Sequence, residues 1–337
     1  MSLLEPKAVY KPFRYPWCYE AWEIQQSLHW LPKEVPLADD VKDWRTKLTD
    51  SERNLVTQIF RFFTQSDIEV NNCYMKKYAT VFGPTEVQMM LSAFSNMETI
   101  HIAAYSHLLD TIGIPESEYQ AFLEYDEMKE KYDYLQNFSC DTKKGLVRTL
   151  AVYGAFTEGL QLFASFAILL NFPRFNKMKG MGQIVTWSVR DETLHTQSII
   201  KLYHTFLAEN PELDTKELHD ELIAECHQVV KNEDKFIDLA FEMGDMEGLS
   251  ANEVKQYIRY IADIRLEELG LEKQFFIEKN PLSWLDVILN GVEHTNFFEG
   301  RSTEYARAAT QGDWEEVFQP ESFKDDMLAD QDGNISH

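Results

Sequence analysis

One stretch of the chain, residues 146–172, is apolar on nearly every side and yet carries a carboxylate near its centre. Its sequence, LVRTLAVYGAFTEGLQLFASFAILLNF, leaves no broad polar face. A helix that is apolar all round is buried by other elements. Its longest apolar run, 160–170, contains Gln161 and Ser165 and is far shorter than the ~20 residues that span a bilayer. We therefore expect a core helix of a protein outside the membrane, with Glu158 in the interior.

Several other segments have apolar residues at helical spacing. Thr49-Asp50-Ser51-Glu52 is typical of a helix start, Gly83-Pro84 is a break, and Gly113 is a stop. With 14 glycines and 11 prolines in 337 residues, the chain is poor in the turn residues that an all-β protein needs. The sequence predicts an all-α helical bundle with an irregular, proline-rich arm at 1–36. Besides the core helix, helices are expected at 19–30, 49–79, 85–112, 181–210, 214–242, 250–268 and 270–279, and a short one starts at Pro115.

The charge and the cysteines narrow the function classes. The chain has 32 basic and 56 acidic residues, a net charge of −24, so it should repel nucleic acid and anionic lipid. No two of its four cysteines form a C-x-x-C, so we expect neither a disulfide framework nor a zinc ribbon. Its first residues, MSLLEPKAVYKPF, lack an apolar signal segment. Together these features predict a cytoplasmic protein that binds neither nucleic acid nor a membrane.

Two Glu-x-x-His pairs, Glu98/His101 and Glu192/His195, lie in predicted helices. The spacing alone is weak evidence for a functional site, because nine histidines and 56 acidic residues in 337 positions yield one or two such pairs by chance. Each pair, however, shares a helix face with apolar neighbours. Buried carboxylates and imidazoles are costly unless something compensates their charge.

Two further carboxylates, Asp67 and Glu158, lie on the helices that precede the pairs. Four carboxylates in an apolar bundle repel one another unless they are protonated or cations lie between them. Two carboxylate helices and two Glu-x-x-His helices are the arrangement of dimetal carboxylate four-helix bundles. The donor set favours iron or manganese over zinc, and no H-E-x-x-H of a zinc protease occurs. The alternative is a set of surface helices whose acids and histidines face water.

Tyr105 follows His101 by four residues and Glu98 by seven, so it should share their helix face. An ordinary core tyrosine would fit this position too. Taken together, Asp67, Glu98-x-x-His101-x-x-x-Tyr105, Glu158 and Arg190-Asp191-Glu192-x-x-His195 resemble the small, radical-generating subunit of class I ribonucleotide reductase. The resemblance extends from about Tyr19 to Tyr305.

This resemblance implies a ferritin-like helical bundle with additional helices and two metal ions per chain, iron first and manganese as the alternative. The metal ligands would be Asp67, Glu98, His101, Glu158, Glu192 and His195. With dioxygen, the metal pair would generate a tyrosyl radical on Tyr105. The radical would oxidise a cysteine of a large subunit, which reduces ribonucleoside diphosphates to deoxyribonucleotides. A homodimer is also implied, and a manganese–iron mechanism is less expected, since relatives that use it have Phe in place of the tyrosine.

The resemblance also implies a radical exit route through Asp191 and Trp30 to Tyr305. Without it, Trp30 reads as a packing anchor, and Asp191 as an ion-pair partner. A radical needs a dry pocket, and helical spacing from Glu158 brings Leu162 and Phe166 toward the metal side. Ser188, one turn before Glu192, is polar where an apolar residue is expected.

The predicted domain covers residues 1–305, and 306–337 is predicted to be a flexible acidic tail that docks on the large subunit. The tail ends in DGNISH without the expected apolar ending, so docking could instead use Trp314, Val317, Phe318 or Phe323. Two other functions remain open at this point. One is a ferritin-like dimetal oxidase or hydroxylase with its own organic substrate, and the other is an iron-storage protein.

Overall fold

The apolar stretch that was expected to be buried is one uninterrupted rod in the computed structural model. α8 (Lys143–Leu150), η4 (Ala151–Gln161) and α9 (Leu162–Arg174) follow one another directly, and every residue of 149–172 is buried. By length and composition this rod could cross a membrane, but its most apolar window, with a mean hydropathy of 1.3, lies wholly inside the protein. It is the core helix of the bundle.

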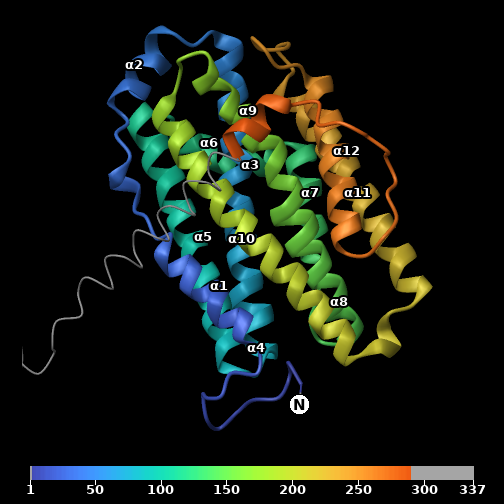
Figure 1. Ribbon diagram of the computed structural model, residues 1–337. Helices are drawn as coiled ribbons and strands as arrows, with labels where there is room; N and C mark the ends of the chain where they lie inside the picture. The colour runs from blue at the N-terminus through green and yellow to red at the C-terminus, as the bar shows by residue number, and fades with distance from the viewer. Residues whose placement is uncertain (1, 290–337) are drawn as a thin grey trace, which may run out of the picture. The chain divides into compact units, whose positions relative to one another are not determined.

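The structure describes residues 2–289, and the fold is that of these residues. Other helices pack around the rod (Figure 1). The elements before the rod are α1 (Pro16–Ser27), η1 (Pro32–Glu34), α2 (Ala38–Thr46), α3 (Asp50–Asn72), η2 (Cys73–Tyr78), α4 (Ala79–Val81), α5 (Thr85–Ile112), α6 (Ser117–Gln120), η3 (Ala121–Glu124) and α7 (Asp126–Gln136). The elements after it are α10 (Lys179–Glu209), η5 (Pro211–Leu213), α11 (Lys216–Ala240) and α12 (Ala251–Glu268).

Local sequence explains where the two long helices α3 and α5 begin and end. Thr49 and Glu52 form a reciprocal capping box at the start of α3, with the Glu52 amide donating to Thr49 Oγ1 at 3.2 Å. Pro84 precedes the first residue of α5. Gly113 ends α5 in the left-handed conformation, at φ 86°, which a residue without a Cβ adopts readily.

The start of α10 depends on residues far away in the sequence. Met178, the residue before the helix, is itself left-handed, with φ 50°. Asp40 of α2 accepts hydrogen bonds from the amides of Gly180 at 2.9 Å and Met181 at 2.8 Å. Asp43 accepts another from Met178 at 3.0 Å. Carboxylates thus satisfy amides that a helix start leaves without intrahelical partners.

Four elements enclose the interior that matters for function. α3 packs on α5, α5 on α10, and η4 on both α10 and α3. α1 crosses this group and contacts α5 and α10. α11 and α12 pack on η4, on the right of the view in Figure 1. The rod therefore packs against elements that come both before and after it in the sequence.

The all-α prediction is confirmed for residues 2–289, in which the structure has no strand and a single isolated bridge between Met246 and Leu249. The helix expected at 270–279 is wrong. Gly270 ends α12 at φ 79°, and Phe276 is left-handed. Asp263 accepts hydrogen bonds from the amides of Gln274 and Phe275, which hold this segment in an irregular, non-helical course. The predicted tail 306–337 lies outside the described residues.

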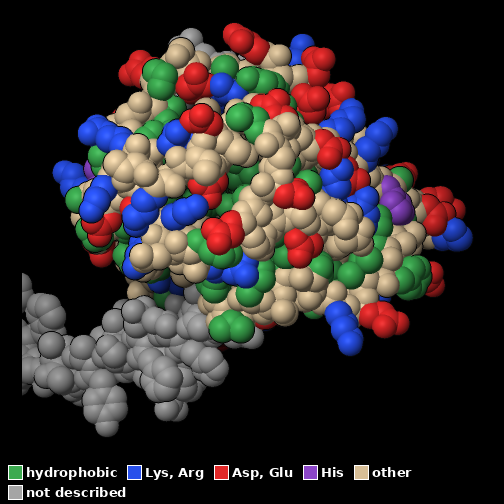
Figure 2. Space-filling view, turned by 90° about the horizontal axis from the view of Figure 1, so that it is seen from above, with side chains coloured by type: hydrophobic (Ala, Val, Ile, Leu, Met, Phe, Trp, Pro, Cys, Tyr) green, Lys and Arg blue, Asp and Glu red, His purple; other side chains and the backbone are tan. Residues whose placement is uncertain are grey.

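Charged side chains of both signs are interspersed on the face of the molecule shown in Figure 2. The usual place for carboxylates in this protein is therefore its surface, where water solvates them. Against that background, carboxylates in the bundle interior are the exception that the site must explain.

Candidate metal centre

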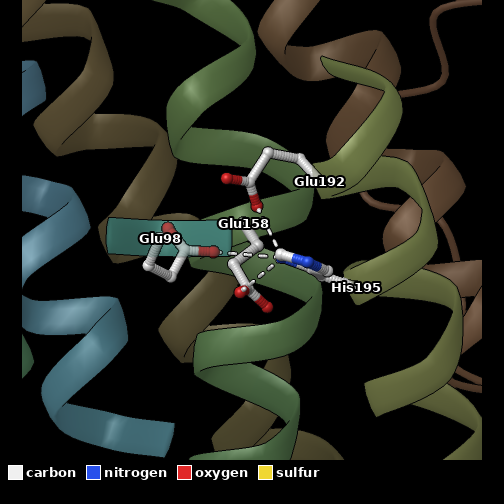
Figure 3. Close-up of side chains that lie close together, drawn as sticks. All are labelled: Glu98, Glu158, Glu192 and His195. Carbon is white, nitrogen blue, oxygen red and sulfur yellow. Dashed lines mark ion pairs between the residues drawn. The ribbon is translucent and has the colours of Figure 1, made fainter. Parts of the chain in front are cut away.

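Six side chains converge between α3, α5, η4 and α10. In one group, Glu98, Glu158, Glu192 and His195 offer ligand atoms that all lie within 4.8 Å of one another. Figure 3 shows the three carboxylates directed toward the His195 ring. A second group with the same spacing consists of Asp67, Glu98 and His101. All six residues are buried, so the sequence-predicted set is brought together without exception.

The two imidazoles have the same orientation. His101 Nδ1 lies 3.3 Å from Glu192 Oε1 and 3.6 Å from Glu98 Oε2. His195 Nδ1 lies 3.1 Å from Glu98 Oε1 and 3.6 Å from Glu158 Oε1. Both rings thus direct Nδ1 into the cluster. Each Nε2 points outward to a polar partner, as in metal-binding histidines whose second nitrogen is held by another residue.

Several atoms at the centre of this cluster have no hydrogen-bond partner among residues 2–289. They are Asp67 Oδ2, both carboxylate oxygens of Glu98, Glu192 Oε2 and His195 Nδ1. Buried polar atoms without partners are rare in folded proteins and call for an explanation. A pair of divalent cations fits, because four carboxylates and two imidazoles are the ligands that iron and manganese accept.

Without cations, the side chains of the cluster have strongly shifted pKa values. Burial raises the pKa of Asp67 well above its usual value and that of Glu158 to about 8, and neighbouring carboxylates add to both effects. Burial opposes charge on His101 and His195 as well, yet the carboxylates that surround each ring raise both pKa values. Burial would raise the pKa of Glu98 too, but the two imidazoles hold it below its usual value. Protons therefore take the place of cations in the metal-free site.

Tyr105 lies beside this cluster in an aromatic pocket. Its ring is fully buried, and its centroid is 4.8 Å from that of Phe63 and 5.6 Å from that of Phe60. Phe166 packs against Phe63 at 5.4 Å. The phenol donates a hydrogen bond of 2.7 Å to Ser188 Oγ. Burial, and then the charge of Asp67, raise the pKa of Tyr105 well above its usual value, so the phenol keeps its proton.

The residues predicted for the exit route also lie together. Asp191 Oδ2 accepts from Trp30 Nε1 at 2.9 Å and lies 3.2 Å from His101 Nε2. The Trp30 ring is 6.1 Å from the His101 ring. Asp191 thus connects Trp30 to the proposed ligand His101. Tyr305, together with Trp314, Val317, Phe318 and Phe323, lies outside the described residues.

Sequence reasoning missed two residues of the site. Gln25 on α1 accepts from His195 Nε2 at 3.1 Å and donates to Asp191 Oδ1 at 3.3 Å, so it bridges the outer partners of both histidines. Tyr74 in η2 donates a 2.6 Å hydrogen bond to Glu158 Oε1. A signal existed for Tyr74, which follows Asp67 by seven residues, as Tyr105 follows Glu98. No local pattern in the sequence indicates Gln25.

Comparison with known proteins adds an independent observation. The family model described as "Ribonucleotide reductase, small chain" matches residues 7–281. This chain belongs to the ribonucleotide reductase small-chain family. One relative, the probable ribonucleoside-diphosphate reductase small subunit 376L of Invertebrate iridescent virus 6, is 42% identical over 94% of this chain and 99% of its own length. The ribonucleoside-diphosphate reductase subunit beta of Chlamydia pneumoniae is 31% identical over 88% of this chain and 89% of its own length.

Solved structures share the fold of this family member. The ribonucleotide reductase R2 subunit from Clostridium botulinum superposes with a TM-score of 0.80 at 22% identity, over 86% of this chain and 94% of its own. The dimanganese(II)-NrdF of Streptococcus sanguinis superposes with a TM-score of 0.71 at 20% identity, over 86% and 100%. The ferritin-like helical bundle expected from the ribonucleotide reductase resemblance is confirmed.

Proposed function

We propose that this chain is the radical-generating small subunit of a class I ribonucleoside-diphosphate reductase. The observation that carries the proposal is the convergence of six buried carboxylate and imidazole side chains from four helical segments beside one buried phenol. The matches to named small subunits support the same function. They do not favour the dimetal oxidase or hydroxylase alternative.

The six residues Asp67, Glu98, His101, Glu158, Glu192 and His195 would hold two metal ions. When bound and oxidised by dioxygen, this pair supplies a one-electron oxidant. Glu98 belongs to both groups of ligand atoms that lie within 4.8 Å of one another, so it could contribute to holding either ion. The histidine Nδ1 atoms face the site, and Asp191 and Gln25 hold the rings from outside. The protein thus fixes the donors before metal enters.

Tyr105 would lose one electron and its phenolic proton to become a neutral radical. Its aromatic surroundings exclude water and offer few atoms that a radical attacks. From there, the oxidising equivalent would travel through His101, Asp191 and Trp30, and through Tyr305, to a cysteine of the large subunit. We further propose a cytoplasmic homodimer that pairs with this large subunit through the tail 306–337.

We propose iron as the metal, with manganese as the alternative. Both metals accept this donor set, and selection in cells depends on geometry and supply as well as affinity. Anomalous X-ray scattering at the iron and manganese edges, on protein from its native host, distinguishes a di-iron, a dimanganese and a mixed site. A site filled by manganese alone would contradict the iron assignment and leave the ligand assignment intact.

Electron paramagnetic resonance tests the radical. Metal-free protein is loaded with ferrous iron and exposed to dioxygen, and the radical signal is recorded. We expect the tyrosyl signal in the unmodified protein, its loss in Tyr105→Phe, and no change in Tyr203→Phe. Tyr203 is a matched control because it is a fully buried tyrosine of α10 outside the cluster.

Tyr74→Phe decides between the two phenols at the site. Tyr74 touches Glu158 directly, whereas Tyr105 contacts Ser188. If Tyr105→Phe kept the signal and Tyr74→Phe lost it, the radical would belong to Tyr74. If no variant affected the signal and both metals were bound, the tyrosyl proposal would be refuted.

A further inference from the structure

The hydrogen bond between Tyr105 and Ser188 has a defined direction. Ser188 Oγ lies 3.1 Å from the carbonyl oxygen of Ile184 and donates its only proton there. The 2.7 Å contact with Tyr105 therefore has the phenol as donor and the serine as acceptor. Both side chains are fully buried, so no bulk water competes for either group.

Oxidation of Tyr105 would turn its oxygen from a hydrogen-bond donor into an acceptor. The neutral phenoxyl oxygen has no proton and can only accept a hydrogen bond. If Ser188 kept its proton on Ile184, two oxygens with lone pairs would face each other at about the present distance in a dry pocket, which is unfavourable. Rotation of the serine hydroxyl removes this conflict. The Ile184 carbonyl retains a partner, because the backbone amide of Ser188 bonds to it within α10.

We propose that Ser188 is a positioning residue that accepts a hydrogen bond from Tyr105 and donates one to the Tyr105 radical. The inference rests on the proposed function. The bound metals would supply the one-electron oxidant that takes the electron of Tyr105, and a carboxylate of the metal site would take the phenolic proton. Ser188 would only reorient its own hydroxyl proton. No bond to Ser188 is broken or formed other than hydrogen bonds.

Ser188 is already placed for both hydrogen bonds, so no neighbouring side chain has to move. α10 carries Ser188 four residues before Glu192, so the same helix face presents the hydroxyl to Tyr105 and the carboxylate to the metals. Phe60 and Phe63 pack on the Tyr105 ring without offering a hydrogen-bond donor. The radical would thus be protected by aromatic rings and held at its oxygen by a single polar contact.

High-field electron paramagnetic resonance and deuteron electron–nuclear double resonance test this proposal. The protein is loaded with ferrous iron and dioxygen in D₂O. A donated hydrogen bond gives an exchangeable deuteron coupling at the radical and lowers its gx value. We expect both in the unmodified protein and in Ser188→Thr. In Ser188→Ala the coupling should disappear and gx should rise.

Thr205→Val is the matched control. Thr205 lies on the same helix and donates an equivalent hydrogen bond to a carbonyl four residues earlier, at 2.7 Å, but it is remote from Tyr105. This variant should keep the coupling and the gx value of the unmodified protein.

The outcomes separate the two proposals. A radical whose coupling and gx are the same with and without the Ser188 hydroxyl overturns the role of Ser188 and leaves the proposed function intact. If Ser188→Ala forms no radical, Ser188→Cys decides, because its longer, weaker donor should shrink the coupling, and an equal coupling overturns the inference. Absence of any radical in the unmodified, metal-loaded protein overturns the proposed function and this inference together.

Discussion

Gln25 connects the two histidines of the metal centre through their outer nitrogens. It accepts from His195 and donates to Asp191, which in turn contacts His101. Replacement by the apolar side chain of Gln25→Met leaves His195 Nε2 without its buried partner. We expect metal affinity to fall about 10- to 100-fold, the usual effect of losing such an outer contact. Competition titration with a chromogenic chelator measures it.

Gln26→Met is the control for this change. Gln26 is the next residue of the same helix and is exposed. Its replacement should leave the metal affinity unchanged. Equal affinities for both variants and the unmodified protein would show that His195 is oriented without Gln25.

The protons held by the metal-free site predict how metal binding depends on pH. Metals bind carboxylates and neutral imidazoles, so binding must displace protons. The pKa of Glu158 is about 8, because burial disfavours its charge. Apparent metal affinity should therefore rise as the pH is raised toward about 8, roughly tenfold per pH unit for each proton displaced. Calorimetry in buffers of different ionisation enthalpy counts the released protons.

The same shift affects the stability of the metal-free protein with a defined sign. The Glu158 carboxyl is protonated in the folded chain up to a pKa of about 8 but only up to about 4.5 in the unfolded chain. The folded state thus binds more protons in this window, and the free energy of unfolding should decrease as the pH rises through it. Glu158→Gln should flatten this dependence in urea titrations. A free energy of unfolding that rose with pH in the unmodified protein would contradict the assignment.

The residues of the site differ in how far the sequence predicts them. Glu98, His101 and Tyr105 share a helix face by spacing alone, and apolar neighbours mark that face as buried. Gln25 could not be found this way. It belongs to a short helix whose contact with α10 is a matter of packing between distant segments. Helical spacing predicts neighbours within one helix, and it carries no information about which other helix lies opposite.

Helix ends show the same division between local and distant causes. The capping box at Thr49 and the left-handed Gly113 depend only on residues near them in the sequence. The start of α3 and the end of α5 were therefore predicted. The start of α10 is not local, because Asp40 and Asp43 of α2 supply its caps. The π-helical course of η4 around Glu158 was not predicted either. A wider helical turn of this kind leaves no signature in hydrophobic spacing, and such turns are frequent at functional sites.

The capping of α10 yields a prediction for this element. Asp40→Ala removes the acceptor of two amides at a buried helix start. We expect the free energy of unfolding to fall by about 1 to 2 kcal/mol. Since α10 carries Glu192 and His195, metal affinity should fall as well. Urea titration of the metal-free protein measures the first effect.

Asp39→Ala is the matched control, because Asp39 lies in the same first turn of α2 and is exposed. It should change the free energy of unfolding by no more than about 0.5 kcal/mol. An equal loss in both variants would mean that the caps from α2 do not stabilise α10.

The proposed function of the whole molecule requires two separable tasks, forming the radical and passing it to another protein. Tyr105 and the proposed metal ligands would serve the first task. Trp30 is placed for the second, because it donates to Asp191 at 2.9 Å on the outer side of His101. Trp30→Phe should therefore leave the radical yield near that of the unmodified protein and abolish nucleotide reduction with the large subunit. Tyr305→Phe should behave in the same way.

Trp187→Phe distinguishes hydrogen-bonded transfer from simple packing in this region. The Trp187 ring lies 5.1 Å from that of Trp30, so its loss disturbs the same packing while the hydrogen bond from Trp30 to Asp191 is kept. We expect its turnover to remain close to that of the unmodified protein. Radical yield is measured by electron paramagnetic resonance, and turnover by deoxynucleotide formation. Normal turnover in both Trp30→Phe and Tyr305→Phe would refute the route, whereas loss of the radical itself in Trp30→Phe would place Trp30 with the metal centre.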